Sequence, residues 1–187
     1  MNSFLLAATL LAAPFTANLA QANDDALLAD ARKVASSLAP KLMPILQQEV
    51  AKAGAEGAIP VCKDMAPIMA AEVSQQTGWK IKRVSLKVRN EARGTPDVWE
   101  KAALEDFDAR AAAGESPAKL EKGAQVGNEY RYVKAVPMMA QCLACHGNAE
   151  QISPAVKAVL DKHYPNDRAT GYALGQIRGV ISVRKSL

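Results

Sequence analysis

The sequence predicts an α+β fold in which helices flank an antiparallel sheet. Apolar residues recur at helical spacing in the first part of the chain, and segments that alternate with a period of two follow later, separated by helical ones. The elements do not follow the regular strand–helix–strand order that a parallel sheet requires. An antiparallel sheet with flanking helices is therefore the expected architecture.

The first predicted helix covers residues 24–53. Its apolar positions at helical spacing are Leu28, Ala31, Val34 and Leu38. We expect a kink near Pro40, because proline lacks the backbone N–H that the helix uses. Gly54 and Gly57 are expected to close the helix.

The second predicted helix has two alternative starts. It begins at Pro60 and bends at Pro67, or it begins near Asp64, whose side chain would cap it and leave Pro67 in an early position. In the first alternative, Cys62 lies in or near the first helical turn.

Strands and helices then alternate irregularly. Residues 79–88 predict a strand, residues 90–97 a polar loop, and a helix starts at Pro96 and stops at Gly114. The later elements are a strand over 130–136, a short helix over 156–160 and a hairpin over 171–183.

Residues 1–22 are predicted to be a signal peptide. Their apolar run, residues 4–13, is too short to span a bilayer, and Ala20-Gln21-Ala22 supplies the small residues of a cleavage site, although no lysine or arginine precedes it. We therefore expect a periplasmic protein with no stable membrane insertion. Residues 23–187 are long enough for one domain with its own core.

The net charge of +4 is spread along the chain. Lysine and arginine are interspersed with acids, and aromatic residues make up 5% of the sequence. Nucleic-acid binding is therefore not expected.

Cys142, Cys145 and His146 form a C-x-x-C-H motif. The two thiols are spaced to add to the vinyl groups of a haem, and the histidine that follows is placed as proximal ligand of the iron. One covalently bound haem c is the favoured interpretation. A dithiol redox site would normally lie in a thioredoxin-like βαβ pattern, and a zinc site would need two further ligands.

The sixth ligand of a haem iron decides whether the protein transfers electrons, senses potential or binds a small molecule. The candidates are Cys62, His163, Met65, Met69, Met138 and Met139. Cys62 is left over once the motif uses two cysteines, so it is buried, a ligand, or paired between chains. Lys63 and a position in the first turn of a helix would favour its thiolate form. An exposed position is the favoured interpretation for His163.

The chain resembles a bacterial and cyanobacterial family of PAS-like c-type haem proteins, often fused to sensor kinases. The segments that carry the resemblance are 58–62, 83–90, 96–100, 142–147, 164–165, 169–172 and 175–179. The chain departs from the family pattern at Glu91 and Arg93. The resemblance implies a PAS-like fold around one haem c, with His146 and the distant Cys62 as the axial pair.

These observations predict an exported monohaem c-type cytochrome of low potential that acts in redox sensing or electron transfer. A thiolate ligand stabilises ferric iron, hence the low potential. The expected partner is a redox protein or a sensor kinase. Arg83, Arg89 and Arg178 are candidate partners of the haem propionates, because guanidinium groups suit carboxylates, although a solvent-facing position is expected for each.

The alternative is a haem-based module or enzyme in which the sixth ligand is displaced by a gas or a peroxide. The sequence has no Ser-His-Asp set, no distinctive carboxylate pair and no phosphate loop, so an electron-transfer or sensor protein is favoured over an enzyme. A thiol oxidoreductase without haem is the third alternative.

Overall fold

The structure is a computed structural model that describes residues 15–187, with side chains from Gln21 onward. Most of the predicted signal peptide, residues 1–22, therefore lies outside the described residues. No helix in the range 15–187 is both long and apolar enough to cross a membrane.

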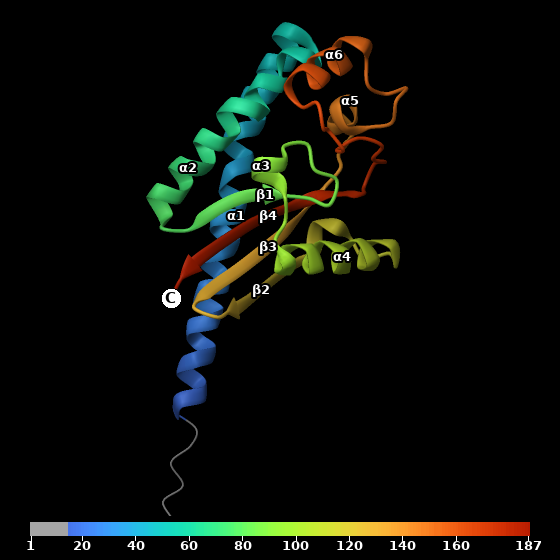
Figure 1. Cartoon of the computed structure of the whole chain (residues 1–187). Coiled ribbons are helices and arrows are strands. Elements are labelled where there is room, and N and C mark those ends of the chain that lie inside the picture. The colour runs from blue at the N-terminus through green and yellow to red at the C-terminus, as the bar shows by residue number, and fades with distance from the viewer. Residues whose placement is uncertain (1–14) are drawn as a thin grey trace, which may run out of the picture.

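A four-stranded antiparallel sheet forms the centre of the molecule (Figure 1). Its strands are β1 (Lys80–Val84), β2 (Glu121–Val126), β3 (Glu129–Pro137) and β4 (Ile177–Ser186), in the order β1-β4-β3-β2. In the two ladders that β4 forms, Val183 is the partner of both Ile81 and Tyr132. The predicted α+β class, with an antiparallel sheet between helices, is confirmed.

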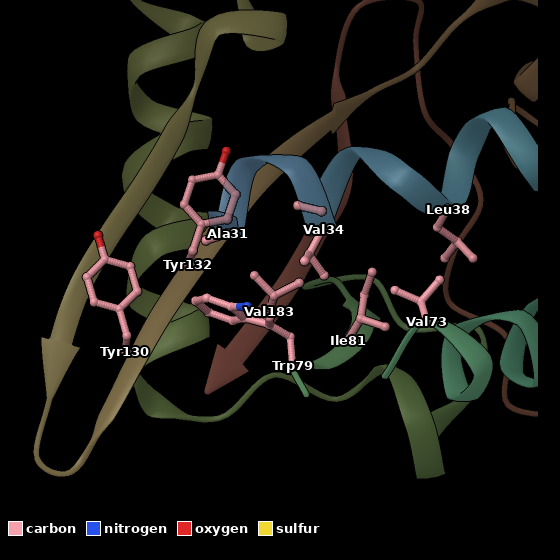
Figure 2. Close-up of a cluster of buried hydrophobic side chains, with 10 residues drawn as sticks. Ala31, Val34, Leu38, Val73, Trp79, Ile81, Tyr130, Tyr132 and Val183 are labelled. Carbon is pink, nitrogen blue, oxygen red and sulfur yellow. The ribbon is translucent and has the colours of Figure 1, made fainter. Parts of the chain in front are cut away.

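Helices cover both faces of the sheet. On one face, α1 (Phe15–Gly57) and α2 (Ala66–Thr77) pack on a cluster that contains Trp79 and Tyr132 (Figure 2). On the other face, α4 (Val98–Ala112) packs on a second apolar cluster. Its buried members are Val84, Ala103, Leu104, Phe107, Leu120, Val133, Ala135, Ile177 and Val180.

Helix α1 does not kink near Pro40, where a kink was predicted, but its helical backbone is interrupted at Gly54, where its end was predicted. It contains Pro40 and Pro44 and continues through both, and the non-helical backbone lies at Ala53 and Gly54. Both prolines are on the exposed side of the helix, where water can satisfy the carbonyl that each leaves without a donor. Gly54 has a φ of 73°, which favours glycine and turns the chain.

The second helix follows the first of its two predicted alternatives. Ile59 and Pro60 are already helical, and a π-helical turn, η1 (Val61–Met65), precedes α2. Cys62 lies in this turn. Single π-helical turns often occur at functional sites, because the wider turn displaces side chains from their α-helical positions.

Strand β1 is shorter than the predicted segment 79–88. After Val84 the chain leaves the ladder, because the Ser85 hydroxyl donates to the carbonyl of Lys87 at 2.6 Å and the Ser85 N–H donates to the carbonyl of Gly94 at 3.1 Å. A short helix, α3 (Glu91–Gly94), occupies the predicted loop.

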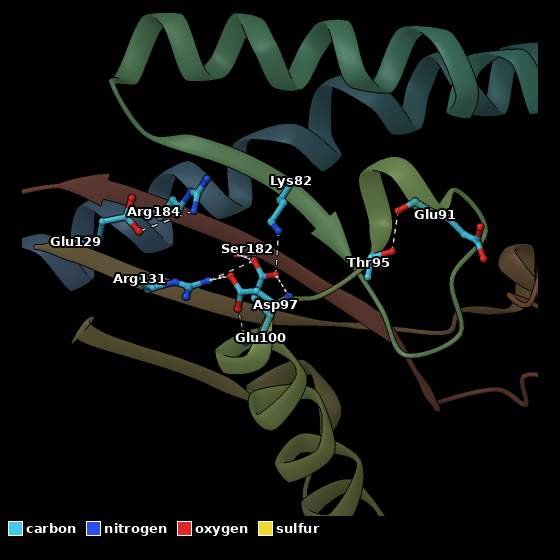
Figure 3. A network of polar contacts seen from close by, with 9 residues as sticks. All are labelled: Lys82, Glu91, Thr95, Asp97, Glu100, Glu129, Arg131, Ser182 and Arg184. Atoms are coloured by element: carbon cyan, nitrogen blue, oxygen red, sulfur yellow. Dashed lines mark hydrogen bonds and ion pairs between the residues drawn. The ribbon is translucent and has the colours of Figure 1, made fainter. Parts of the chain in front are cut away.

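The start of α4 is fixed by a capping box. Asp97 accepts from the Glu100 N–H at 3.0 Å, and the Glu100 carboxylate accepts from the Asp97 N–H at 2.9 Å. Glu100 is fully buried and also meets Lys82 at 2.9 Å, Ser182 at 2.7 Å and Arg131 at 3.6 Å (Figure 3). This network holds α4 on the sheet.

Strands β2 and β3 form a hairpin, of which only the second strand was predicted from the sequence. The strand over 130–136 is confirmed as β3, but β2 is an exposed edge strand without apolar alternation. The two-residue turn Gly127-Asn128 was the signal in the sequence that could have revealed it.

The predicted hairpin over 171–183 is wrong. Only β4 is a strand, and Tyr172 donates its backbone N–H to the carbonyl of His146 at 3.0 Å instead of joining a ladder. The predicted helix over 156–160 is confirmed within α6 (Pro154–His163). It lies beyond one end of the sheet, beside the C-x-x-C-H motif (Figure 1).

Candidate haem site

The C-x-x-C-H motif forms one compact helical segment. Cys142 ends the short 3₁₀ helix η3 (Ala140–Cys142), and α5 (Leu143–His146) follows at once. A spacing of three residues in a helical segment brings both thiols to the same side. The chain therefore presents two thiols and an imidazole within two short turns.

The two motif cysteines pack into different apolar clusters. Cys142 contacts the cluster of Met138, Ala169 and Tyr172, and Cys145 contacts the cluster that contains Ile59, just before the π-helical turn. Both cysteines are half-buried free thiols. The motif thus connects the segment around Cys62 with the segment before β4.

Burial raises the pKa of the Cys145 thiol. The positive charge of Arg89 opposes this, whereas the negative charges of Cys62, Cys142 and Glu56 raise the pKa further. The segment that carries Cys62 also lies close to Cys145, because Ile59 packs in the same cluster as Cys145. Burial disfavours a thiolate at Cys145, and a neutral sulfur is therefore favoured there.

The His146 imidazole has a defined orientation. Its Nδ1 is 2.7 Å from the carbonyl oxygen of Ala169, and since a carbonyl only accepts, Nδ1 carries the proton. Nε2 then keeps its lone pair, the state in which an imidazole binds a metal. Burial, followed by the charges of Arg178, Arg89 and Arg83, lowers the pKa of His146 well below its usual value of 6.5, so the ring is neutral.

The three candidate propionate partners have different environments. Arg83 is exposed, and Arg89 is occupied, since it pairs with Asp167 at 2.9 Å and donates to the carbonyl of Cys145 at 2.5 Å. Arg178 is 4% exposed, so the expected solvent-facing position is wrong for this residue. In the ion pairs of the described chain Arg178 has no carboxylate partner.

Arg178 lies against the His146 ring. Its Nε is 3.2 Å from Nδ1 and 3.5 Å from Nε2, and its Nη1 donates to Ser85 Oγ at 2.9 Å. Because Nδ1 donates its proton to Ala169, Nδ1 cannot accept a hydrogen bond from the guanidinium. Burial lowers the pKa of Arg178 to about 9, assisted by Arg83 and opposed by Tyr172.

Cys62 is an exposed thiol on the π-helical turn, so the alternative in which it is a buried apolar residue is wrong. The segment that carries Cys62 lies near Tyr164 as well as Cys145, because Ile59, three residues before Cys62, packs in one cluster with both. Cys62 and Cys145 come from segments more than eighty residues apart in the sequence.

The other candidate sixth ligands have different environments. Met138 is buried beside Tyr172, and Met69 packs on the apolar cluster of α1 and α2. Met65 and Met139 are 40% and 44% exposed. His163, for which an exposed position was expected, is half-buried at the end of α6, and its Nδ1 is 3.0 Å from Lys63 Nζ.

A cavity of about 190 Å³ lies beside the π-helical turn. Its walls are formed by Lys63, Arg89, Asn90, Glu91, His163, Tyr164, Pro165 and Asn166. Within the described part of the chain, no three or more His, Cys, Asp or Glu side chains are grouped in a way that could hold a metal ion.

The family model of the Tll0287-like proteins matches residues 16–186. The chain belongs to the Tll0287-like family. This confirms the family resemblance inferred from the sequence, and the match includes Cys62 and the whole C-x-x-C-H motif.

A solved member provides a structural comparison for this Tll0287-like chain. The crystal structure of the cyanobacterial haem protein Tll0287 is similar, with a TM-score of 0.56 and 27% identity over 67% of this chain and 71% of that one. No curated protein matches the chain.

Two contributors to the site were not found from the sequence. Asp167, which pairs with Arg89, and the carbonyl of Ala169, which orients His146, both lie in the loop after α6. Asp167 follows Arg89 by 78 residues, and no local pattern predicts such a pair. A backbone carbonyl has no sequence signature at all.

Proposed function

We propose that the chain is a monohaem c-type cytochrome of PAS-like fold that acts in redox sensing or electron transfer. The observation that carries this proposal is the turn formed by Cys142, Cys145 and His146, with its neutral imidazole held by Ala169. The membership of the Tll0287-like family supports it, because the solved relative is a haem protein. The haem iron would supply one-electron redox chemistry.

Cys142 and Cys145 would attach the haem through thioethers. Both are free thiols on neighbouring short turns, and each borders an apolar cluster. A thioether carries no charge, so it suits the position of Cys145, where burial disfavours a thiolate. The apolar clusters on either side would contact the haem edge.

His146 would be the proximal ligand through Nε2. The Nδ1–H···O contact to Ala169 fixes the tautomer and the ring plane, and a hydrogen bond of this kind also makes the imidazole a better donor. Arg89 holds the same segment from the other side, through the carbonyl of Cys145 and the carboxylate of Asp167.

Cys62 would be the second axial ligand. Its thiol is exposed on a π-helical turn whose flanking residue Ile59 packs in the same cluster as Cys145. An anionic sulfur favours the more positive ferric ion, so the potential would be low.

The test has two stages in full-length protein made in a host that attaches haem c. Pyridine haemochrome analysis should report one haem bound through two thioethers. Cys62→Ser should then change the low-spin ferric spectrum and raise the potential, because the anionic ligand is lost. Met65→Leu removes the other exposed sulfur of the same turn and should leave both unchanged. An unaltered spectrum and potential in Cys62→Ser would contradict Cys62 as ligand.

A gas-binding or peroxide-binding module is the second candidate function, and the exposure of Cys62 favours it, because an exposed ligand can leave the iron. Prompt binding of carbon monoxide by the reduced protein would support this alternative. Failure to bind it would favour electron transfer with both axial ligands retained.

We also propose that the protein is exported to the periplasm and acts with a separate partner protein. Residues 1–22 would direct export, and a redox protein or a sensor kinase would receive the electron or the signal. Deletion of residues 2–22 should leave the protein in the cytoplasm without haem, and periplasmic haem protein from the deleted form would contradict the assignment.

A further inference from the structure

Arg178 is a buried charge that no carboxylate balances. Its side chain comes from β4 and is 4% exposed, yet it forms no ion pair in the described chain. Another arginine of low exposure, Arg131, is within 4.0 Å of the carboxylates of Asp97 and Glu100. Charges buried without a counter-ion are costly, and such costs are commonly tolerated where the charge has a function.

Neutral oxygens hold the guanidinium in place. Nη1 donates to Ser85 Oγ at 2.9 Å and to the carbonyl of Lys87 at 3.3 Å, and Ser85 Oγ itself donates to that carbonyl at 2.6 Å. These contacts fix the position of the group and leave its net charge intact. Ser85 is buried, so the arrangement is shielded from solvent.

The guanidinium of Arg178 faces His146, the histidine of the C-x-x-C-H motif. Nε of Arg178 is 3.2 and 3.5 Å from the two ring nitrogens of His146, and the centre of the Tyr172 ring is 5.5 Å from the guanidinium carbon. The side chain is therefore confined between the proposed proximal ligand and a buried aromatic ring.

We propose that Arg178 is a positioning residue that raises the reduction potential of the haem iron, opposing the Cys62 thiolate. This inference rests on the proposed function. Reduction of ferric to ferrous iron adds one electron and moves no proton, so the charge at the iron falls by one. A fixed cation beside His146, in a medium of low dielectric constant, would stabilise the reduced state relative to the oxidised one.

The test compares potentials of haem-loaded full-length variants in a titration with dithionite as electron donor. Arg178→Gln keeps a hydrogen-bonding side chain but removes the charge. It should lower the ratio of ferrous to ferric protein at a given potential about tenfold, which is about 59 mV for one electron. Arg178→Lys keeps the charge and should retain most of the wild-type potential.

Arg184→Gln is the matched control. Arg184 lies on the same strand and loses the same charge, but its side chain is 38% exposed and lies 3.8 Å from Glu129. Its potential should match that of the wild type, because solvent screens the change.

Three results would overturn the inference. They are an unchanged potential in Arg178→Gln, an equal fall in Arg178→Gln and Arg178→Lys, or an equal fall in Arg184→Gln.

If Arg178→Gln does not accumulate, Ser85→Asp provides a second variant. A carboxylate beside Nη1 would cancel the positive charge while the arginine stays in place. It should lower the potential as well, and an unchanged value would overturn the inference. Wild-type protein without covalent haem would refute the proposed function, and the inference with it.

Discussion

The region around the sheet and the region around the C-x-x-C-H motif differ in whether a buried charged side chain has an oppositely charged partner. The sheet region comprises β1–β4 with α1 and α4, and its fully buried Glu100 meets Lys82, Arg131 and Ser182 (Figure 3). The motif region comprises η1, α5, α6 and residues 164–176, and the buried Arg178, which reaches it from the start of β4, meets only neutral groups. The sheet region therefore balances its charge internally, whereas the motif region keeps a charge that can act on a ligand.

The two regions also differ in how they are held together. Nine and ten buried residues form the clusters on the two faces of the sheet. The clusters of the motif region have five and three buried members, and polar contacts such as Arg89 to Asp167 and His146 to Ala169 supplement them. A region of this kind is expected to open at a lower free energy than the sheet region.

The largest expected effect would come from the sheet region. Phe107 is fully buried under α4, and Phe107→Ala should lower the free energy of unfolding by about 3–5 kcal/mol through lost apolar contact and a residual cavity. Urea denaturation followed by circular dichroism measures this loss. Val98→Ala, at a residue 88% exposed on the same helix, is the control and should change it little. Near-equal losses in the two variants would contradict a core beneath α4.

Arg89→Ala should have a smaller and more local effect. It leaves Asp167, whose side chain is 10% exposed, without its cation, and such a loss costs up to about 3 kcal/mol. Hydrogen exchange should increase in α5 and in residues 164–176 and remain slow in the sheet. Arg110→Ala removes an exposed pair with Glu115 and should have little effect on stability, because solvent screens this pair. Equally faster hydrogen exchange in the sheet would show that the two regions open as one unit.

The smallest effect concerns acid stability at the start of α4. Burial raises the pKa of Asp97, but the Glu100 N–H and the Arg131 guanidinium outweigh it, and the net pKa lies below the usual 3.8. The ionised form is therefore favoured in the folded state. Its contribution to stability is complete well above pH 3.8 and is lost as the pH falls below that value.

Asp97→Asn should remove this dependence. The variant and the wild type should differ by about 1 kcal/mol at neutral pH, the typical effect of a helix cap, and converge as the pH falls below 3.8, as thermal unfolding at a series of pH values would measure. A difference that does not change with pH would show that Asp97 acts only as a hydrogen-bonding cap.

Part of the fold followed from local patterns. Helical spacing predicted α1, Pro96 and Gly114 predicted the two ends of α4, and alternation predicted β3. Secondary-structure prediction from local patterns failed where long-range contacts determine the backbone conformation. Tyr172 bonds to the motif backbone and not to a strand, and β2 lies at an exposed edge, where no apolar alternation is needed.

The site shows the same division. Cys142, Cys145 and His146 are recognisable because their function depends on spacing within five residues. The environment of Arg178 was not predictable, because its partners Ser85 and His146 come from segments distant in the chain. The same solvent-facing position was expected from the sequence for Arg83, Arg89 and Arg178, but the three side chains differ in burial in the structure.

The sequence by itself determined the α+β class, the family and the chemical identity of the motif, because these depend on local periodicity and on residue types at short spacing. Folding was needed to orient His146, to pack the segment before the Cys62 turn with Cys145, and to bury Arg178 without a carboxylate partner. Each of these depends on groups that folding brings together from distant parts of the chain, and local sequence preferences contain no information about such distances.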